Sequence, residues 1–110
     1  MWKNAIRVSR ARWTRIAYVG SALLIGIALL PGARGHGYGT QAHRLLVRYL
    51  FAHTPVHRIQ ADTEVANIPE QRALEKAGFT REGVLRGIGW RDGAWRDGVT
   101  YSILRTDPPA

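Results

Sequence analysis

The sequence contains no cysteine among its 110 residues. A disulfide framework and a thiolate metal site are therefore excluded. The same absence fits a reducing compartment, so we expect the chain in the cytoplasm. Acidic residues are also scarce, with 8 against 16 basic ones and a formal net charge of +8. The length corresponds to one small domain.

Long hydrophobic runs are missing as well. The longest apolar stretch runs from Ile16 to Leu30, which is shorter than the ~20 residues that a membrane-spanning helix needs. No clear small-x-small cleavage site follows it. We favour a buried strand here and expect no membrane partner. The alternative is a signal peptide or an anchor, which would make the chain a small basic membrane-anchored protein.

The excess positive charge lies at the start of the chain. The first fifteen residues carry five basic side chains and no acidic one, namely Lys3, Arg7, Arg10, Arg12 and Arg15. High positive charge is typical of nucleic-acid-binding proteins, but no recognised nucleic-acid motif accompanies it, so we do not expect a nucleic-acid partner. Residues 1–21 are predicted to be a basic arm of undefined structure, and residues 106–110 a tail.

From Ala22 onward, the pattern predicts an α/β (α+β) fold with the order β-α-β-α-β-β. The first strand, Ala22–Leu30, is almost entirely apolar, as in a strand covered on both faces. A helix is predicted from Gln41 to His53 with Thr40 as its N-cap. Its apolar face is expected to carry Ala42, Leu45, Leu46, Tyr49 and Leu50. The alternation over Val56–Thr63 predicts the next strand.

The second predicted helix has signals at both ends. Asn67 is a suitable N-cap, and Glu70 stands at capping-box spacing from it. Gly78 ends the helix, and Phe79 fits the hydrophobic contact that often follows such a glycine. Two strands, Glu82–Trp90 and Trp95–Arg105, then flank an Asp-Gly turn and predict a hairpin.

A glycine-rich turn joins the first strand to the first helix. It reads Arg34-Gly35-His36-Gly37-Tyr38-Gly39-Thr40. Glycines let the backbone approach an anion, and the first N–H groups of a helix lack internal partners, so this arrangement favours phosphate binding. The dinucleotide pattern G-x-G-x-x-G fails at Thr40, and the Gly-Lys-Ser/Thr of a P-loop is absent.

Two motifs together resemble a known family. Arg34-x-x-Gly37-x-Gly39 after a strand is similar to the acetyl-CoA pyrophosphate motif of the GNAT N-acetyltransferases. Downstream, Asn67-x-x-x-x-Arg72-x-Leu74-Glu75-Lys76-x-Gly78-Phe79 is similar to the RimJ/RimL-type branch of that family. The resemblance covers residues 22–105, which we interpret as the acetyl-CoA-binding part of a partial GNAT-like fold with a mixed central sheet.

The resemblance implies a cosubstrate, a reaction and a site. In such enzymes the strands on either side of the first helix splay apart, and acetyl-CoA enters the gap. A primary amine, on a protein N-terminus or a small molecule, attacks the thioester directly. A backbone N–H near Leu29 is expected to stabilise the oxyanion. The residues implied in cofactor binding are Leu29, Leu30, Arg34, Gly35, His36, Gly37, Tyr38, Gly39, Thr40 and Asn67.

Several of these residues have simpler interpretations. Asn67 is also explained as a helix cap alone, and Arg34 as a solvated loop charge. Glu70 stands where the branch often has a serine that is proposed to protonate the leaving thiolate, so the general acid is unassigned. Tyr101 is expected in the core rather than as an acid. The tryptophans at 90 and 95 fit an acceptor pocket or hairpin packing equally well.

No metal is expected, because His43, His53 and His57 do not form a ligand pattern. A larger departure concerns the front of the chain, since the family places about three strands and two helices before Ala22–Leu30. We therefore expect a truncated gene product, a start-site error or half of a swapped assembly. One edge of the Ala22–Leu30 strand would then be unpaired and open to homo-oligomerisation. A catalytically inactive, CoA-binding remnant is the alternative function.

Overall fold

A computed structural model describes residues 4–6, 11–19, 22–29 and 38–108, with side chains for residues 22–26 and 39–108. Within these residues, six strands form one mixed sheet in the order β1-β2-β3-β4-β6-β5. Strands β3 and β4 are parallel, and the other neighbouring pairs are antiparallel. The elements are β1 (Asn4–Ile6), β2 (Ala11–Val19), β3 (Ala22–Leu29), α1 (Tyr38–His53), β4 (Arg58–Glu64), α2 (Ile68–Lys76), β5 (Thr80–Arg91) and β6 (Ala94–Leu104). From β3 onward the order β-α-β-α-β-β is confirmed.

The start of the chain differs from the expected irregular arm. Strand β2 pairs antiparallel with β3 from Val19↔Ala22 to Ala11↔Leu29, and β1 pairs in turn with β2. The prediction of an unpaired edge on the Ala22–Leu30 strand is therefore wrong, and the homo-oligomer that rested on this edge loses its basis. In the parts of the chain that the structure describes, no helix is long and apolar enough to span a membrane.

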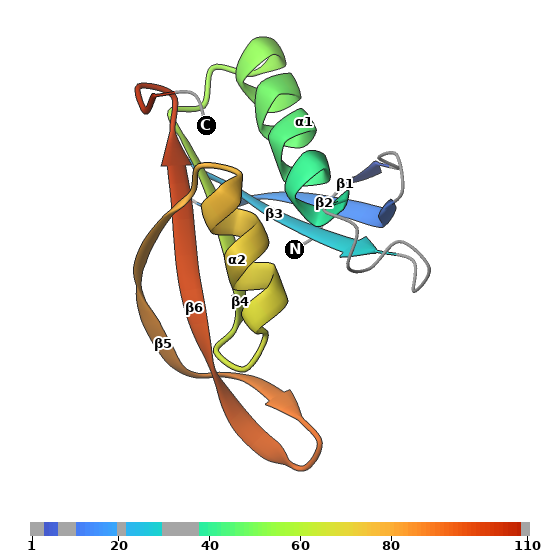
Figure 1. The fold of residues 1–110 in the computed structure, drawn as a ribbon, viewed down its shortest axis with the longest axis vertical. Helices are drawn as coiled ribbons and strands as arrows, with labels where there is room; N and C mark the ends of the chain where they lie inside the picture. The colour runs from blue at the N-terminus through green and yellow to red at the C-terminus, as the bar shows by residue number, and fades with distance from the viewer. Residues whose placement is uncertain (1–3, 7–10, 20–21, 30–37, 109–110) are drawn as a thin grey trace.

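Both helices lie on the same face of the sheet (Figure 1). Apolar side chains from the two helices, from β3, β4 and β6, and from the segments next to them fill the space between helices and sheet. The buried cluster comprises Leu23, Ile25, Leu46, Val47, Leu50, Val56, Ile59, Ala61, Leu74, Ala77, Phe79, Val99, Tyr101 and Ile103. Strand β4 shows the expected alternation, because Ile59 and Ala61 face this core while their neighbours point to the other face.

Helix α1 differs from its prediction at its start and on its buried face. It begins at Tyr38, so Thr40 lies inside the first turn and is not the N-cap. Leu45 and Tyr49 were expected to be buried but are 48% and 52% exposed. His43 and Val47 are buried instead, because α2 covers that side of the helix. The buried face of α1 is therefore rotated about the helix axis by about one residue position from the predicted face.

Helix α2 has the predicted boundaries. Asn67 is the N-cap, and its Oδ1 accepts a hydrogen bond from the Glu70 N–H at 3.3 Å. At the other end, Gly78 has a φ of +98°. The N–H of Gly78 bonds the Glu75 carbonyl, and the N–H of Phe79 bonds the Leu74 carbonyl, which together form a Schellman motif. Phe79 is buried, as predicted.

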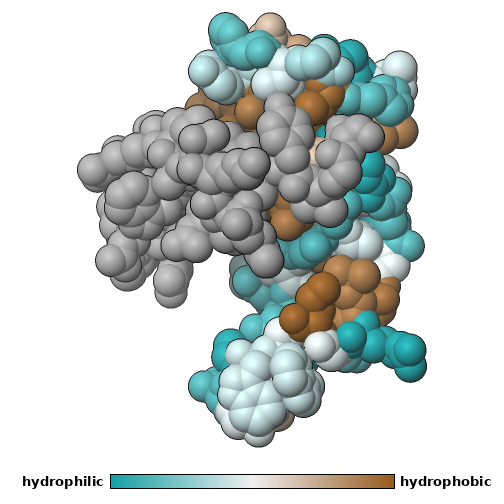
Figure 2. Space-filling view, turned by 180° about the vertical axis from the view of Figure 1, so that it is seen from behind, coloured by the Kyte–Doolittle hydropathy of each residue, from teal (hydrophilic) through white to brown (hydrophobic). Residues whose placement is uncertain are grey.

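The predicted hairpin extends beyond the body of the domain (Figure 1). Asp92 and Gly93 have φ values of 51° and 77°, as a type I′ turn requires. Trp90 and Trp95 face each other across the strands in a T-shaped pair, with ring centroids 5.4 Å apart. Seen from the face that the helices leave open, apolar surface gathers over β5 near this tip (Figure 2).

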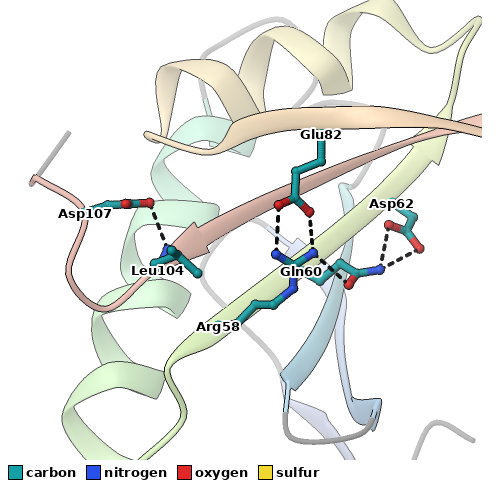
Figure 3. A network of polar contacts seen from close by, with 6 residues as sticks. All are labelled: Arg58, Gln60, Asp62, Glu82, Leu104 and Asp107. Atoms are coloured by element: carbon teal, nitrogen blue, oxygen red, sulfur yellow. Dashed lines mark hydrogen bonds and ion pairs between the residues drawn. The ribbon is translucent and has the colours of Figure 1, made fainter.

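A chain of polar side chains runs across that open face of the sheet (Figure 3). Arg58 Nη1 and Nη2 both donate to the Glu82 carboxylate. Arg58 Nη2 also donates to Gln60 Oε1, and the Gln60 amide nitrogen donates to Asp62. The Arg58 hydrogen bonds hold the pKa of Glu82 below its usual value, and the same bonds raise the pKa of Arg58. The face of β4 that points away from the core therefore carries hydrogen-bonded polar side chains.

Candidate functional site

The two parallel strands separate toward their carboxyl ends. Pairing between β3 and β4 covers only Leu23↔Ile59 to Ile25↔Ala61. Beyond this point β3 continues to Leu29 on its partner β2, and β4 continues to Glu64 on its partner β6. The facing edges of Gly26–Leu29 and Asp62–Glu64 are therefore not paired with each other (Figure 1). Backbone groups left open in this way need water or a ligand as partner.

Both helices start on the side of the sheet where the gap opens. Each follows one of the two parallel strands, so α1 and α2 present their first turns to the same edge. The first N–H groups of a helix have no partner inside it and carry the positive end of the helix dipole. An extended ligand in the gap would therefore lie along the unpaired edges of β3 and β4. The N-termini of α1 and α2, which attract anions, would lie close to it.

The predicted cofactor residues are only partly within the described residues. Leu29 is the last residue of β3, at the mouth of the gap. Residues 38–40, which are Tyr38, Gly39 and Thr40, form the first turn of α1. The other predicted residues lie outside the described residues, namely Leu30 and the turn residues Arg34, Gly35, His36 and Gly37.

Asn67 lies where β4 leads into α2. Its N–H donates to the Glu64 carbonyl at 2.9 Å, and its side-chain oxygen caps the helix. Its Nδ2 donates no hydrogen bond within the part of the chain that the structure describes, and the residue is exposed. A shallow concavity lined by Glu64, Ala66, Asn67 and Arg91 adjoins it. The capping role is therefore confirmed, while the amide nitrogen stays available to a ligand.

An ion pair fixes the other wall of this concavity. Arg91 on β5 donates from Nε and Nη2 to the two carboxylate oxygens of Glu64, at 2.6 and 2.9 Å. The Arg91 hydrogen bond lowers the pKa of Glu64, and the same bond raises the pKa of Arg91. Glu64 is thus held as a carboxylate at the end of β4. Because both side chains reach solvent, the pair contributes position more than stability.

The sequence did not indicate the contact between His43 and Glu70. His43 on α1 is 1% exposed, and its Nε2 lies 3.1 and 3.2 Å from the two carboxylate oxygens of Glu70. Glu70 was predicted to complete a capping box by bonding the N–H of Asn67. That N–H is already bound to the Glu64 carbonyl, so the Glu70 carboxylate turns to His43 instead. The one feature of the sequence that could have indicated this contact is the position of His43 beside the apolar residues of the helix, where a buried histidine needs a polar partner.

The comparisons with known proteins agree with this geometry. A family model described as Acetyltransferase (GNAT) domain matches residues 5–80, which is more than half of the chain. The chain belongs to the GNAT acetyltransferase family. The separation of β3 and β4 is the feature that the resemblance had predicted for a member of this family.

Named relatives are similar over most of this chain and about half of their own length. The probable N-acetyltransferase YjcK of Bacillus subtilis is 40% identical over 83 residues, which is 76% of this chain and 46% of YjcK. The structure of Mycobacterium smegmatis RimJ in complex with CoA-disulfide has a TM-score of 0.78 and 29% identity, covering 84% of this chain and 46% of RimJ. A spermidine N-acetyltransferase from Vibrio cholerae has a TM-score of 0.79 at 20% identity over 86% of this chain and 58% of that enzyme, which shows the fold alone.

Tyr101 belongs to the core of this GNAT domain, as predicted. It is fully buried on β6, and its hydroxyl donates to Glu75 Oε2 at 2.8 Å. Burial, and next the bond to Glu75, raise the pKa of Tyr101 to about 12. The phenol therefore keeps its proton and faces α2. Among the described residues, no group of three or more histidine, aspartate or glutamate side chains is arranged to hold a metal ion.

Proposed function

We propose that this GNAT domain binds acetyl-CoA and transfers its acetyl group to a primary amine. The observation that carries the proposal is the early end of β3–β4 pairing at Ile25↔Ala61, which leaves two strand edges open between the first turns of two helices. A pantetheine arm carries amide groups that suit an open strand edge, and a pyrophosphate suits a helix N-terminus. The CoA-disulfide bound by the related RimJ agrees with this cosubstrate.

The residues divide between holding the cofactor and stabilising charge. The main chain near Leu29 and Leu30 would pair with the pantetheine. The turn from Arg34 to Thr40 would hold the pyrophosphate, and Asn67 would donate from Nδ2 to the cofactor arm. A backbone N–H near Leu29 would bond the thioester oxygen as it becomes an oxyanion.

The reaction needs no covalent enzyme intermediate. The neutral amine attacks the thioester carbonyl carbon, and a tetrahedral intermediate forms. The C–S bond then breaks, CoA leaves as the thiolate, and the amide product keeps the acetyl group. The proton that the amine loses passes to a base or a water chain, and one proton is taken up by the thiolate. The acceptor is a protein N-terminus or a small amine, as in a RimJ/RimL-type enzyme.

A second candidate function is CoA binding without acetyl transfer. It is favoured by the engagement of two possible proton donors, since Tyr101 bonds Glu75 and Glu70 bonds His43. The chain spans about half the length of the curated relatives it matches. CoA binding without transfer would fit the engagement of these two side chains.

Thiol release separates the two candidates. The purified chain is mixed with acetyl-CoA and a panel of N-terminal peptides and small amines, and free CoA is followed with a thiol reagent. The chain contains no cysteine, so the colour reports CoA alone. Release of CoA matched by an acetylated amine in the mass spectrum supports transfer. Saturable CoA binding without release supports the second candidate, and no binding contradicts both.

A further inference from the structure

The His43–Glu70 contact joins the two helices that border the acetyl-CoA gap. His43 lies in the second turn of α1, on the same face as Gly39 and Thr40 one turn earlier. Glu70 lies in the first turn of α2, three residues after the cap Asn67. The contact therefore connects the beginning of one helix to the beginning of the other.

Glu70 is held at both its main chain and its side chain. Its N–H donates to Asn67 Oδ1, while its carboxylate accepts from His43 Nε2. A movement of α2's first turn relative to α1 would break the bond to His43, whereas the capping bond to Asn67 would move with α2. Glu70 thus links the cap residue Asn67 to the first half of α1.

Burying a histidine at this position costs free energy. His43 is almost fully buried, and its Nδ1 has no hydrogen-bond partner among the described residues. A buried polar atom without a partner loses its hydration and gains nothing in return. An apolar side chain beside Phe79, whose ring centroid is 5.9 Å from that of His43, would pack without this loss. Packing alone therefore does not account for a histidine here.

We propose that His43 and Glu70 are positioning residues for acetyl-CoA: their bond holds the Asn67-bearing turn of α2 against the first turns of α1, so that both helix ends face the gap together. The proposal rests on the proposed function. Neither side chain needs to touch the cofactor, because the bond acts through the placement of Asn67. Losing a hydrogen bond to a charged group typically changes an equilibrium constant by about tenfold or more.

The test compares the Kd for CoA with the melting temperature in a set of variants. Glu70→Ala removes the carboxylate and is expected to raise the Kd about tenfold. His43→Leu removes the same bond and also the unpartnered Nδ1, so the melting temperature is expected to stay level or rise while the Kd increases equally. Glu70→Gln keeps an oxygen that accepts from Nε2 and is expected to bind CoA within about twofold of the parent.

A second contact between the helices supplies the matched control. Arg44 Nη2 donates to the Lys76 carbonyl at 2.7 Å, at the far end of α2 from Asn67. Arg44→Ala loosens the helices there without touching the first turns, so the Kd for CoA is expected to stay unchanged. A merely structural role for the His43–Glu70 bond predicts the same for Glu70→Ala, with a lower melting temperature and no change in Kd.

The outcomes separate this inference from the proposed function. A parent chain that binds CoA, with Glu70→Ala and His43→Leu binding equally well, overturns the positioning role and leaves the proposed function standing. The double variant is expected to bind no more weakly than either single one, because one bond is lost in all three. Additive losses would contradict a shared bond. A parent chain that does not bind CoA overturns both proposals.

Discussion

Exchanging Asn67 for aspartate separates its role as a helix cap from its proposed role at the cofactor. The cap uses Oδ1, which accepts from the Glu70 N–H, while Nδ2 donates no bond within the described residues. Asn67→Asp keeps an oxygen at the capping position and replaces the donor by a second, negatively charged oxygen. The cap therefore survives the exchange, and any contact made by Nδ2 does not.

The expected magnitudes follow from this geometry. The capping bond of 3.3 Å is longer than the usual 2.9–3.0 Å, so its loss in Asn67→Ala should cost about 0.5–1 kcal/mol, the lower part of the range for caps. That corresponds to a fall of about 2–6 °C in melting temperature for a chain of this size. In Asn67→Asp the charge gains about 0.3–1 kcal/mol from the helix dipole, so the melting temperature should be unchanged or higher.

CoA affinity should move in the opposite direction. The new carboxylate would face the anionic cofactor, and two like charges about 4 Å apart repel by at least about 1 kcal/mol even in water. Together with the lost donor, this predicts a Kd at least about tenfold higher, measured by isothermal titration calorimetry. Asn67→Ser is the control, because it keeps the cap, adds no charge and should weaken binding less. If Asn67→Asp binds CoA within twofold of the parent, Asn67 is a cap alone and the reasoning fails.

Two further predictions concern the core and the hairpin. Tyr101→Phe loses the bond to Glu75 and should lower the free energy of unfolding in urea by about 0.5–1.5 kcal/mol at neutral pH. Because the pKa of Tyr101 is raised from 10 in the unfolded chain to about 12 in the folded one, this contribution is full below about pH 10 and is lost as the pH rises toward 12. A phenolate signal from Tyr101 at pH 10 would refute this prediction. Gly98→Ala places a Cβ 2.8 Å from Ile88 Cγ2 and 3.2 Å from the Thr63 carbonyl oxygen, so it should destabilise the domain by about 1–3 kcal/mol, and an unchanged urea midpoint would show that the strands shift freely.

The local signals in the second half of the chain were sufficient to predict its elements. Asn67, Gly78 and the Asp92-Gly93 turn fix their conformations through short-range bonds and allowed φ values, so spacing alone located both ends of α2 and the hairpin. The strand predicted at Ala22–Leu30 was also found, at Ala22–Leu29, because a continuous apolar run is typical of a strand that is covered on both faces.

The start of the chain was harder, because the apolar residues Ile16–Val19 of β2 lead directly into the apolar run of β3, so the sequence shows one apolar stretch rather than two strands. The aromatic and β-branched residues of β2, including Trp13, Thr14 and Tyr18, are typical of a strand, but the arginines between them hide the pattern. Pairing with β3 then decides the conformation, and such a long-range partner is not visible in local spacing.

The gap between β3 and β4 was predicted, but the side-chain contacts around it were not. The two motifs identified the family and the gap, and the glycine-rich turn remains a sequence-based prediction at Arg34 and Gly37. The bond between His43 and Glu70 joins residues 27 positions apart and depends on how α1 rotates against α2. A helical pattern gives the width of an apolar face, but the neighbouring helix determines which flank of it is buried.

Calorimetric titration of CoA into the purified chain shows whether this domain binds the proposed cosubstrate. We expect saturable one-to-one binding, a melting temperature raised by several degrees when CoA reaches about 100 times its Kd, and loss of both effects in Gly37→Asp. That variant adds a like charge and a side chain where the backbone is proposed to approach the pyrophosphate. The absence of heat and of any thermal shift at millimolar CoA would contradict acetyl-CoA binding by this domain.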